Sequence, residues 1–335
     1  MKAGEHVQGA SGIIHAWKVG AEGRAEAVAK DCFLDALPSG EGYLWYHFDR
    51  NEPATQALFD ADNGVDRVAT RTLLAADSRP RTIVRGEDVL INLRGVNLNP
   101  GAEPEDMIPL RFFIQPGRVV SCNARNLKAI GDMVTKLQTQ PVSRTPGGFI
   151  ASFALAIIDR MQPTITDLNE QVDDLEDLLD DNSVRGAQDQ ARSQVSELRR
   201  EAILLRRYLA PQRDALTSLS QQSLPWIDAD DQLRLRDAAD QATRVAEELD
   251  AVRERCAIVK DQLTDLRAEQ MNNNMMILSV VAAIFLPLGL LSGMMGINVG
   301  GMPWVENDMG FWFVTAIVVI IGIIQLIVFR MVKWL

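Results

Sequence analysis

The sequence predicts an α/β domain followed by a helical stalk and two helices that cross a membrane. Three observations predict this fold class. Short apolar runs between turn residues fill the first part of the chain, apolar residues then recur every three or four positions, and residues 275–295 and 311–329 contain no ionisable side chain. We therefore expect an α/β domain at 1–150, a helical hairpin and stalk at 151–274, and a membrane domain at 275–335.

The first part carries the pattern of a small sheet with flanking helices. Runs rich in aromatic and β-branched residues predict strands at 43–48, 89–93, 110–114 and 119–122. Glycine and proline mark turns at Gly86, Pro100 and Pro116. Residues 54–74 are expected to be helical. Alternation of strands and helices of this length is typical of an α/β fold.

A pair of helices follows, one acidic and one basic. Apolar spacing predicts helices at 165–179 and 195–209, joined by a turn near 181–186. The first helix has no Lys or Arg, so it is either a hydrated divalent-cation site or a solvated face paired with the arginines of the second. The candidate ligands are Asp173, Asp174, Asp177, Asp180 and Asp181.

A long helix is predicted to lead from this hairpin into the membrane. The apolar positions of its seam are Leu235, Ala238, Ala242, Val245, Leu249, Val252, Cys256, Val259, Leu263 and Leu266. Their alternation of three and four is that of a coiled coil or helix bundle. Residues 230–286 contain no Gly or Pro, so no local signal ends the helix before the first apolar stretch.

The two apolar stretches are predicted to be membrane spans at 275–295 and 311–331, with an outer loop at 296–310. Each is long enough for roughly 30 Å of hydrocarbon. Arg330 and Lys333 follow the uncharged stretch 311–329 of the second span, whereas the charges of the loop are Glu306 and Asp308. By the positive-inside rule, both termini face the cytoplasm and the loop faces outward, where its carboxylates would attract cations.

One face of the first span suggests the wall of an ion path. It reads Asn272, Met275, Ser279, Ala282, Leu286, Gly289, Gly293 and Gly296. Two spans cannot enclose a path, so several copies would each contribute one helix. The same small residues also fit close helix packing in a membrane, and the sequence leaves both interpretations open.

Several classes of protein are excluded. A net charge of −11 without a basic patch argues against nucleic-acid binding. The three cysteines lie far apart, which excludes a disulfide framework and a thiolate zinc site. No phosphate-binding loop or catalytic motif is present, so we expect no enzyme. Neither span holds a carboxylate, His or Cys, which favours recognition of a hydrated cation by amide and carbonyl oxygens. Asn298 would supply such an oxygen, or would simply cap the helix.

At Gly296-Ile297-Asn298 the chain resembles a known family. This triplet after the first of two C-terminal spans is similar to the CorA superfamily of divalent-metal transporters. Ile297 in the middle position, with Val299 to Pro303 after it, resembles the ZntB zinc-transporter branch. Residues 79–81, 93–101 and 198–213 are also similar to that branch.

The resemblance implies a funnel-shaped homopentamer with an αβα cytoplasmic sandwich. It places Gly296, Ile297 and Asn298 in an outer selectivity filter. The pore positions that it implies are Asn272, Met275, Leu278, Leu286, Gly289 and Asn298. Most relatives carry Thr at the position of Gly289, so its absence fits the zinc branch better than a strict Mg²⁺ channel.

The expected function is therefore zinc transport across the bacterial inner membrane. Proton-linked import is proposed for the ZntB branch, although no titratable group in the spans supports the link. Zn²⁺ would be cargo, with no cofactor, and the partners would be other copies, lipid and divalent cations. Two alternatives remain: a CorA-type Mg²⁺ or Co²⁺ channel, and a non-conducting coiled-coil receptor or scaffold anchored in the membrane.

Overall fold

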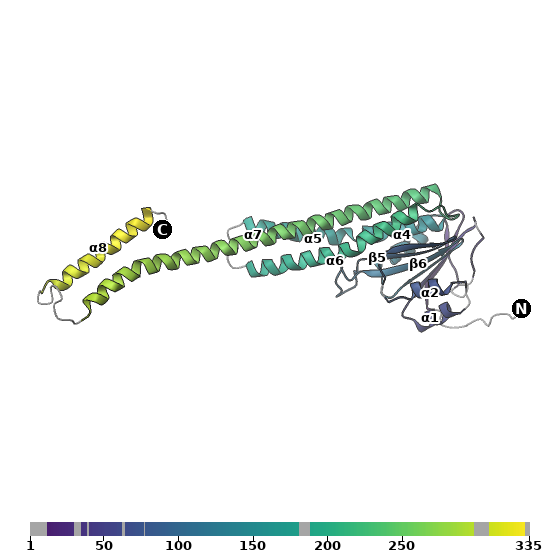
Figure 1. Cartoon of the computed structure of the whole chain (residues 1–335). Coiled ribbons are helices and arrows are strands. Elements are labelled where there is room, and N and C mark those ends of the chain that lie inside the picture. The colour runs from purple at the N-terminus through teal and green to yellow at the C-terminus, as the bar shows by residue number, and fades with distance from the viewer. Residues whose placement is uncertain are drawn as a thin grey trace. The chain divides into compact units, whose positions relative to one another are not determined.

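A seven-stranded sheet forms the centre of the N-terminal part. The computed structural model describes residues 12–29, 35–38, 40–61, 64–76, 78–180, 188–297 and 308–331. The strands are β1 Ile13–Gly20, β2 Ala25–Ala27, β3 Gly42–Asp49, β4 Arg81–Arg85, β5 Asp88–Gly95, β6 Ile108–Gln115 and β7 Arg118–Asn123. Their order is β2-β1-β3-β7-β6-β5-β4, and the β3–β7 pair is parallel while the other pairs are antiparallel. Strands β5 and β6 of this sheet are labelled in Figure 1. The four predicted strands are confirmed.

Helices cover both faces of the sheet, because successive strand residues point to opposite sides. Phe48 packs on Phe59 of α1 (Pro53–Asp60), with ring centroids 5.0 Å apart, and α2 (Arg67–Leu73) completes that layer. Trp45 faces the other way, 5.3 and 5.6 Å from Phe149 and Phe153. Those rings belong to α4 (Pro146–Asp159), which packs beside α3 (Lys128–Thr139). The αβα sandwich is confirmed.

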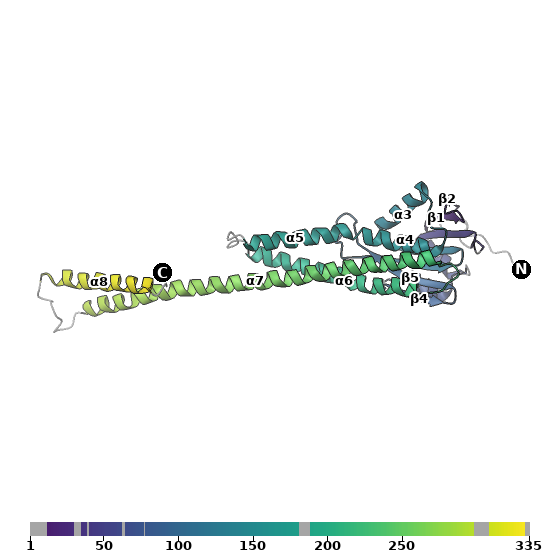
Figure 2. The ribbon, with the colours of Figure 1, turned by 90° about the horizontal axis from the view of Figure 1, so that it is seen from above.

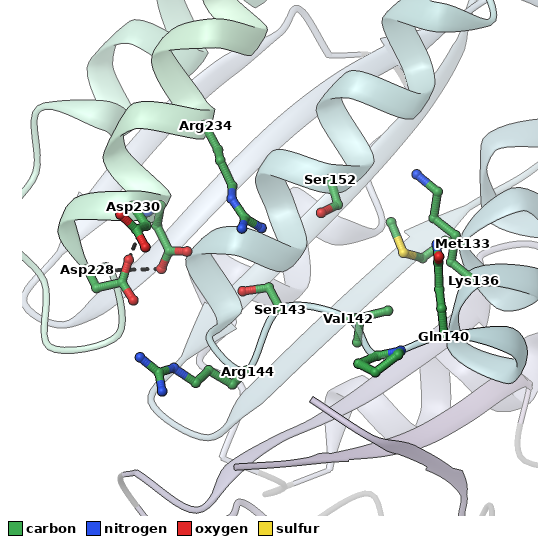
Figure 3. Close-up of a pocket in the computed structure, with 12 residues that line it drawn as sticks. Met133, Lys136, Gln140, Val142, Ser143, Arg144, Ser152, Asp228, Asp230 and Arg234 are labelled. Carbon is green, nitrogen blue, oxygen red and sulfur yellow. Dashed lines mark hydrogen bonds between the residues drawn. The ribbon is translucent and has the colours of Figure 1, made fainter. Parts of the chain in front are cut away.

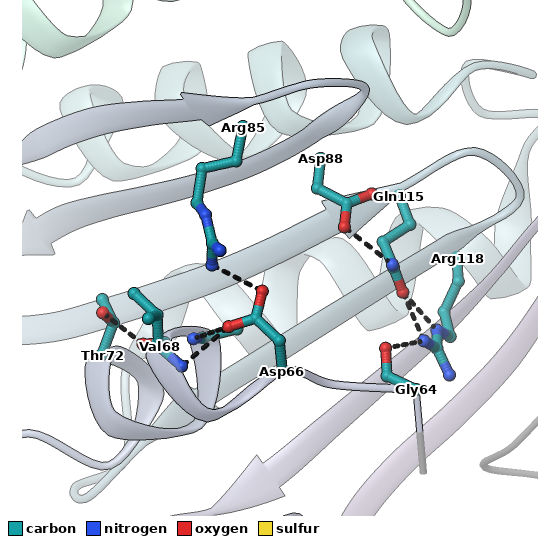
Figure 4. Close-up of polar contacts among 9 residues, drawn as sticks. Gly64, Asp66, Val68, Thr72, Arg85, Asp88, Gln115 and Arg118 are labelled. Atoms are coloured by element: carbon teal, nitrogen blue, oxygen red, sulfur yellow. Dashed lines mark hydrogen bonds and ion pairs between the residues drawn. The ribbon is translucent and has the colours of Figure 1, made fainter. Parts of the chain in front are cut away.

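The single helix expected at 54–74 is two helices, and the expectation of one was wrong. Asp66 is the N-cap of α2: its carboxylate accepts hydrogen bonds from the backbone N–H groups of Val68 and Ala69, at 2.7 and 2.9 Å (Figure 4). The same carboxylate forms an ion pair with Arg85 at 2.5 Å. These bonds and the Arg85 ion pair hold the pKa of Asp66 below its ordinary value, against burial, which would raise it. An N-cap in mid-segment makes the chain end one helix and begin another.

Three long helices extend from the sandwich and share one core. They are α5 (Gln162–Asp180), α6 (Gln188–Ser220) and the first part of α7 (Ala229–Met295), which run side by side in Figures 1 and 2. The predicted seams are buried: Val172 of α5, Leu209 of α6 and Leu249 of α7 have no exposed surface. The remaining helix is α8 (Gly310–Met331).

The described contacts divide the chain into two compact units, residues 1–260 and 261–335. The boundary predicted after residue 150 falls inside α4, and that after residue 274 falls inside α7. The helical hairpin therefore belongs to the same unit as the sheet. Buried side chains join them: Gln212 of α6 accepts the Arg94 amide of β5 at 2.7 Å, and the Arg94 guanidinium lies 4.0 Å from the Tyr208 ring.

The acidic helix does not pair with the arginines of α6 in the part of the chain that the structure describes. Instead Arg255 of α7 donates to both carboxylate oxygens of Glu176, at 2.9 and 2.6 Å, and also to Asp173. The arginines of α6 bind elsewhere: Arg206 pairs with Asp250 of α7 at 2.6 Å. The pairing predicted within the hairpin was wrong because α7 lies against both of its helices.

Candidate functional site

The candidate site lies in residues 261–335, where two helices are long and apolar enough to cross a membrane. They are the C-terminal part of α7 and α8. Large apolar side chains on both are exposed, among them Leu278, Phe285, Leu286, Phe311 and Trp312. Exposed apolar surface of this extent requires lipid or another protein chain to cover it. The second predicted span agrees with α8 to within one residue at each end, and the first predicted span ends together with α7, at Met295.

The predicted pore-lining residues share one uncovered face of α7. They are Asn272, Met275, Leu278, Ser279, Ala282, Leu286, Gly289 and Gly293, and all eight are exposed. Val280 is buried, and Ile284 and Leu291 are partly buried. At 3.6 residues per turn these three positions lie on the opposite side of the helix, which faces α8. A single chain therefore leaves the predicted wall open to water, lipid or neighbouring copies.

The contact between the two spans involves a residue that the sequence analysis missed. Gln325 of α8 donates its side-chain amide to the Ala283 carbonyl of α7 at 3.2 Å. Ala283 precedes Pro287 by four residues, so the backbone donor that would normally bind this carbonyl does not exist. The signal was available, because Gln325 is a strongly polar side chain inside an otherwise apolar span.

The outer end of the first span is only partly described. α7 ends at Met295, and the Gly296 amide donates to the Ser292 and Gly293 carbonyls at 3.0 and 3.1 Å. Ile297 is 55% exposed, so its side chain is not part of a packed cap in the single chain. Asp308 is exposed. Asn298 and Glu306 lie outside the described residues, so their predicted roles stay predictions.

The acidic helix offers less to a metal than its composition suggests. Asp173 is bound by Arg255, whereas Asp174 and Asp177 are exposed. Within the described residues, no group of three or more His, Cys, Asp or Glu side chains is arranged to hold a metal ion. Asp181 and the side chain of Asp180 lie outside the described residues, so the hydrated cation site on this helix remains a prediction.

A polar pocket of about 410 Å³ is lined by the start of α7, by α3 and α4, and by the segment that joins α3 to α4 (Figure 3). Asp228 and Asp231 cap that helix reciprocally: the Asp231 amide donates to Asp228 at 2.8 Å, and the Asp228 amide to Asp231 at 3.2 Å. Cβ atoms added at Gly147 and Gly148 would lie 2.7 and 2.5 Å from the Asp231 carboxylate. Two glycines of α4 therefore make room for the capping group of α7, and burial raises the pKa of Asp231.

The comparisons with known proteins bear on this arrangement. The family model described as "CorA-like Mg2+ transporter protein" matches residues 40–331, which include all of the sandwich except β1 and β2, the long helices and both spans. The chain belongs to the CorA-like family. Its resemblance to CorA and ZntB proteins is therefore confirmed, and it is a divalent-cation transporter of that family.

Two curated bacterial relatives of this CorA-like chain span nearly its whole length. "Divalent cation transporter CmaX" of Pseudomonas aeruginosa is 36% identical over 327 residues, or 97% of each chain. "Zinc transport protein ZntB" of Pectobacterium atrosepticum is 33% identical over 322 residues, which are 96% of this chain and 95% of the relative. The solved structure of full-length CmaX has a TM-score of 0.81 at 34% identity and covers 99% of this chain and 100% of CmaX.

Proposed function

We propose that this CorA-like chain is one subunit of a homopentameric zinc transporter in the bacterial inner membrane. Divalent cations would pass, with part of their hydration shell, through an axial path lined by five copies of α7. The observation that carries the proposal is the uncovered face of α7, opposite α8, whose outer half is nearly bare of side chains at Gly289 and Gly293. Likeness to ZntB proteins supports zinc as the cargo.

Residues at different places along the ion path would have different roles. Asn298, in the filter Gly296-Ile297-Asn298, would present a ring of carbonyl dipoles to the hydrated ion. Glu306 and Asp308 would raise the local concentration of cations at the outer mouth. Met275 and Leu286 are 57% and 71% exposed on the same face and would form apolar constrictions that close by losing water. Arg330 after the second span favours cytoplasmic termini.

The test is zinc flux into liposomes that contain the purified protein and a zinc-sensitive dye. We expect Asn298→Ala to lower the flux by roughly tenfold, because a ring of five dipoles loses its oxygens. Asn273→Ala is the control: Asn273 is an exposed amide on α7 outside the predicted wall. Transport by Asn298→Ala at the wild-type rate would refute the selectivity role.

A CorA-type Mg²⁺ or Co²⁺ channel is the second candidate. It is favoured by the description of the family model and by CmaX, the relative with 36% identity, whose name specifies no metal. Competition of Mg²⁺ and Co²⁺ against Zn²⁺ in the same liposomes separates the two candidates. Repeating the assay with and without a pH gradient tests proton-linked import. A non-conducting scaffold predicts no flux of any cation.

A further inference from the structure

The first span lacks one backbone hydrogen-bond donor, at Pro287. In an α-helix the amide of residue i+4 donates to the carbonyl of residue i. Residue 287 is proline, so the Ala283 carbonyl lacks its usual partner at a depth where water is scarce. The Gln325 side-chain amide donates to that carbonyl at 3.2 Å. A side chain of α8 thus replaces a backbone group of α7.

The surroundings of Gln325 favour this single bond. Gln325 is partly buried between the spans, and among the described residues its Oε1 atom is buried without a hydrogen-bond partner. By contrast, the other polar side chains of the spans bond within their own helix: Ser279 to Met275, Ser292 to Leu288 and Thr315 to Phe311. The bond to Ala283 is a side-chain hydrogen bond between the two spans, and it offsets part of the cost of burying the Gln325 amide.

The position of the bond matters for the predicted wall. Ala283 faces α8, whereas Leu286 and Gly289 lie on the uncovered face on either side of Pro287. Helices kink at proline, because the ring pushes against the carbonyl four residues earlier and no backbone N–H binds that carbonyl. Whatever holds the Ala283 carbonyl therefore also sets the direction of Leu286, the predicted constriction.

We propose that Gln325 is a positioning residue of the ion path, which holds the Pro287 turn of α7 against α8 and thereby sets the place of Leu286. The role in conduction rests on the proposed transport function. The hydrogen bond and its dependence on Pro287 do not, since they are properties of the two helices. Gln325 acts through the backbone of α7 and does not itself touch the ion.

The experiment is a double-variant cycle in the full-length protein. Gln325→Leu keeps the size of the side chain and removes the donor. Pro287→Ala restores a backbone N–H for Ala283. We expect Gln325→Leu to lower the maximal zinc flux about three- to tenfold, the range of one interhelical hydrogen bond, with the half-saturating concentration unchanged. In the Pro287→Ala background the same change should alter the flux by less than about twofold.

Thr315→Val is the matched control on α8, because it removes a polar group that contacts only its own helix. It should leave flux and melting temperature unchanged in both backgrounds. Equal losses from Gln325→Leu with and without Pro287 would overturn the proposal, as would no loss in either. If Gln325→Leu alone fails to assemble, recovery of assembly in the double variant supports the proposal, and failure of both overturns it.

Melting temperature in detergent separates this proposal from the proposed function. It is measured on the same four proteins and needs no transport. A drop for Gln325→Leu that disappears with Pro287→Ala supports the hydrogen-bond role even if the wild type carries no zinc. Conversely, normal zinc flux with additive melting temperatures leaves the transport function standing and removes the role of Gln325.

Discussion

At the scale of single residues, the surroundings of Glu201 on α6 disfavour the negative charge of its carboxylate. Burial raises its pKa first, and the carboxylates of Glu105, Asp167 and Glu103 raise it further, to about 7. Arg200 opposes the shift but is shared, since it also binds the buried Glu105 at 2.8 Å. The folded protein therefore binds a proton here under conditions in which the unfolded chain has released it.

This pKa shift predicts how stability changes with pH. The ordinary pKa of the group is 4.5 and the folded value is about 7. The stability that the raised pKa of Glu201 contributes is thus fully present below pH 4.5 and is lost as pH rises through 7. Glu201→Gln, which cannot ionise, should stabilise the protein by about 1 kcal/mol at pH 8. This value is reduced because the site is half exposed. Near pH 4.5 the substitution should leave the stability unchanged.

Thermal unfolding in detergent at both pH values measures this effect. Glu197→Gln is the matched control, because Glu197 lies one turn earlier on the same helix and is exposed. Glu197→Gln should stabilise the protein at pH 8 by less than Glu201→Gln does, because the Glu197 side chain is exposed. An equal gain at pH 8 for the two variants would show that the carboxylates around Glu201 are not responsible.

Hydrogen bonds between residues that lie far apart along the chain could not be predicted from the sequence. Arg94 and Gln212 both lie in segments that resemble the ZntB branch, but they are 118 positions apart, and no local pattern indicates that they bond. The same holds for Gln325 and Ala283, which are 42 positions apart. Such pairs depend on how elements pack, which spacing along the chain does not encode.

At the scale of elements, Arg255 joins α5 to α7. Its guanidinium binds Glu176 through two nitrogens and also reaches Asp173, and these bonds raise its pKa above the ordinary value. Arg255→Met keeps the aliphatic stem and removes both ion pairs. We expect a loss of about 1 kcal/mol of local stability, or roughly fivefold faster hydrogen exchange in residues 165–179. Arg253→Met is the control, since Arg253 pairs within α7, with Asp250 at 3.4 Å. Unchanged exchange in α5 would contradict the prediction.

The long periodic helices were predicted well, whereas the strands β1, β2 and β4 were missed. The seams of α5, α6 and α7 follow a spacing of three and four over many turns, and their residues are buried except Leu179 and Leu266, which are partly buried. By contrast β2 has three residues, and β4 is an edge strand with arginine at both ends. Neither carries the run of alternating apolar residues that predicts a strand, because an edge strand buries little of its surface.

At the scale of the whole molecule, the sequence located the spans and one face of α7, but could not say what that face meets. The same glycines fit a pore wall and a packing surface. In the single chain a Cβ added at Gly289 or Gly293 meets no atom within 4 Å, so neither glycine is needed for contact with α8. Small residues at these positions therefore serve either an open path or the approach of another copy.

Gly289→Leu separates these two interpretations. If the face lines an axial path, five added isobutyl groups narrow it, and zinc flux should fall at least tenfold while the oligomeric mass in detergent stays that of the wild type. If the face packs against a neighbouring copy, the side chain blocks close approach and the oligomer should dissociate. Ala316→Leu is the control, because Ala316 is an exposed small residue of α8. It should preserve both mass and flux. Dissociation with Gly289→Leu alone would assign the bare face to assembly, and the path would then have to run elsewhere.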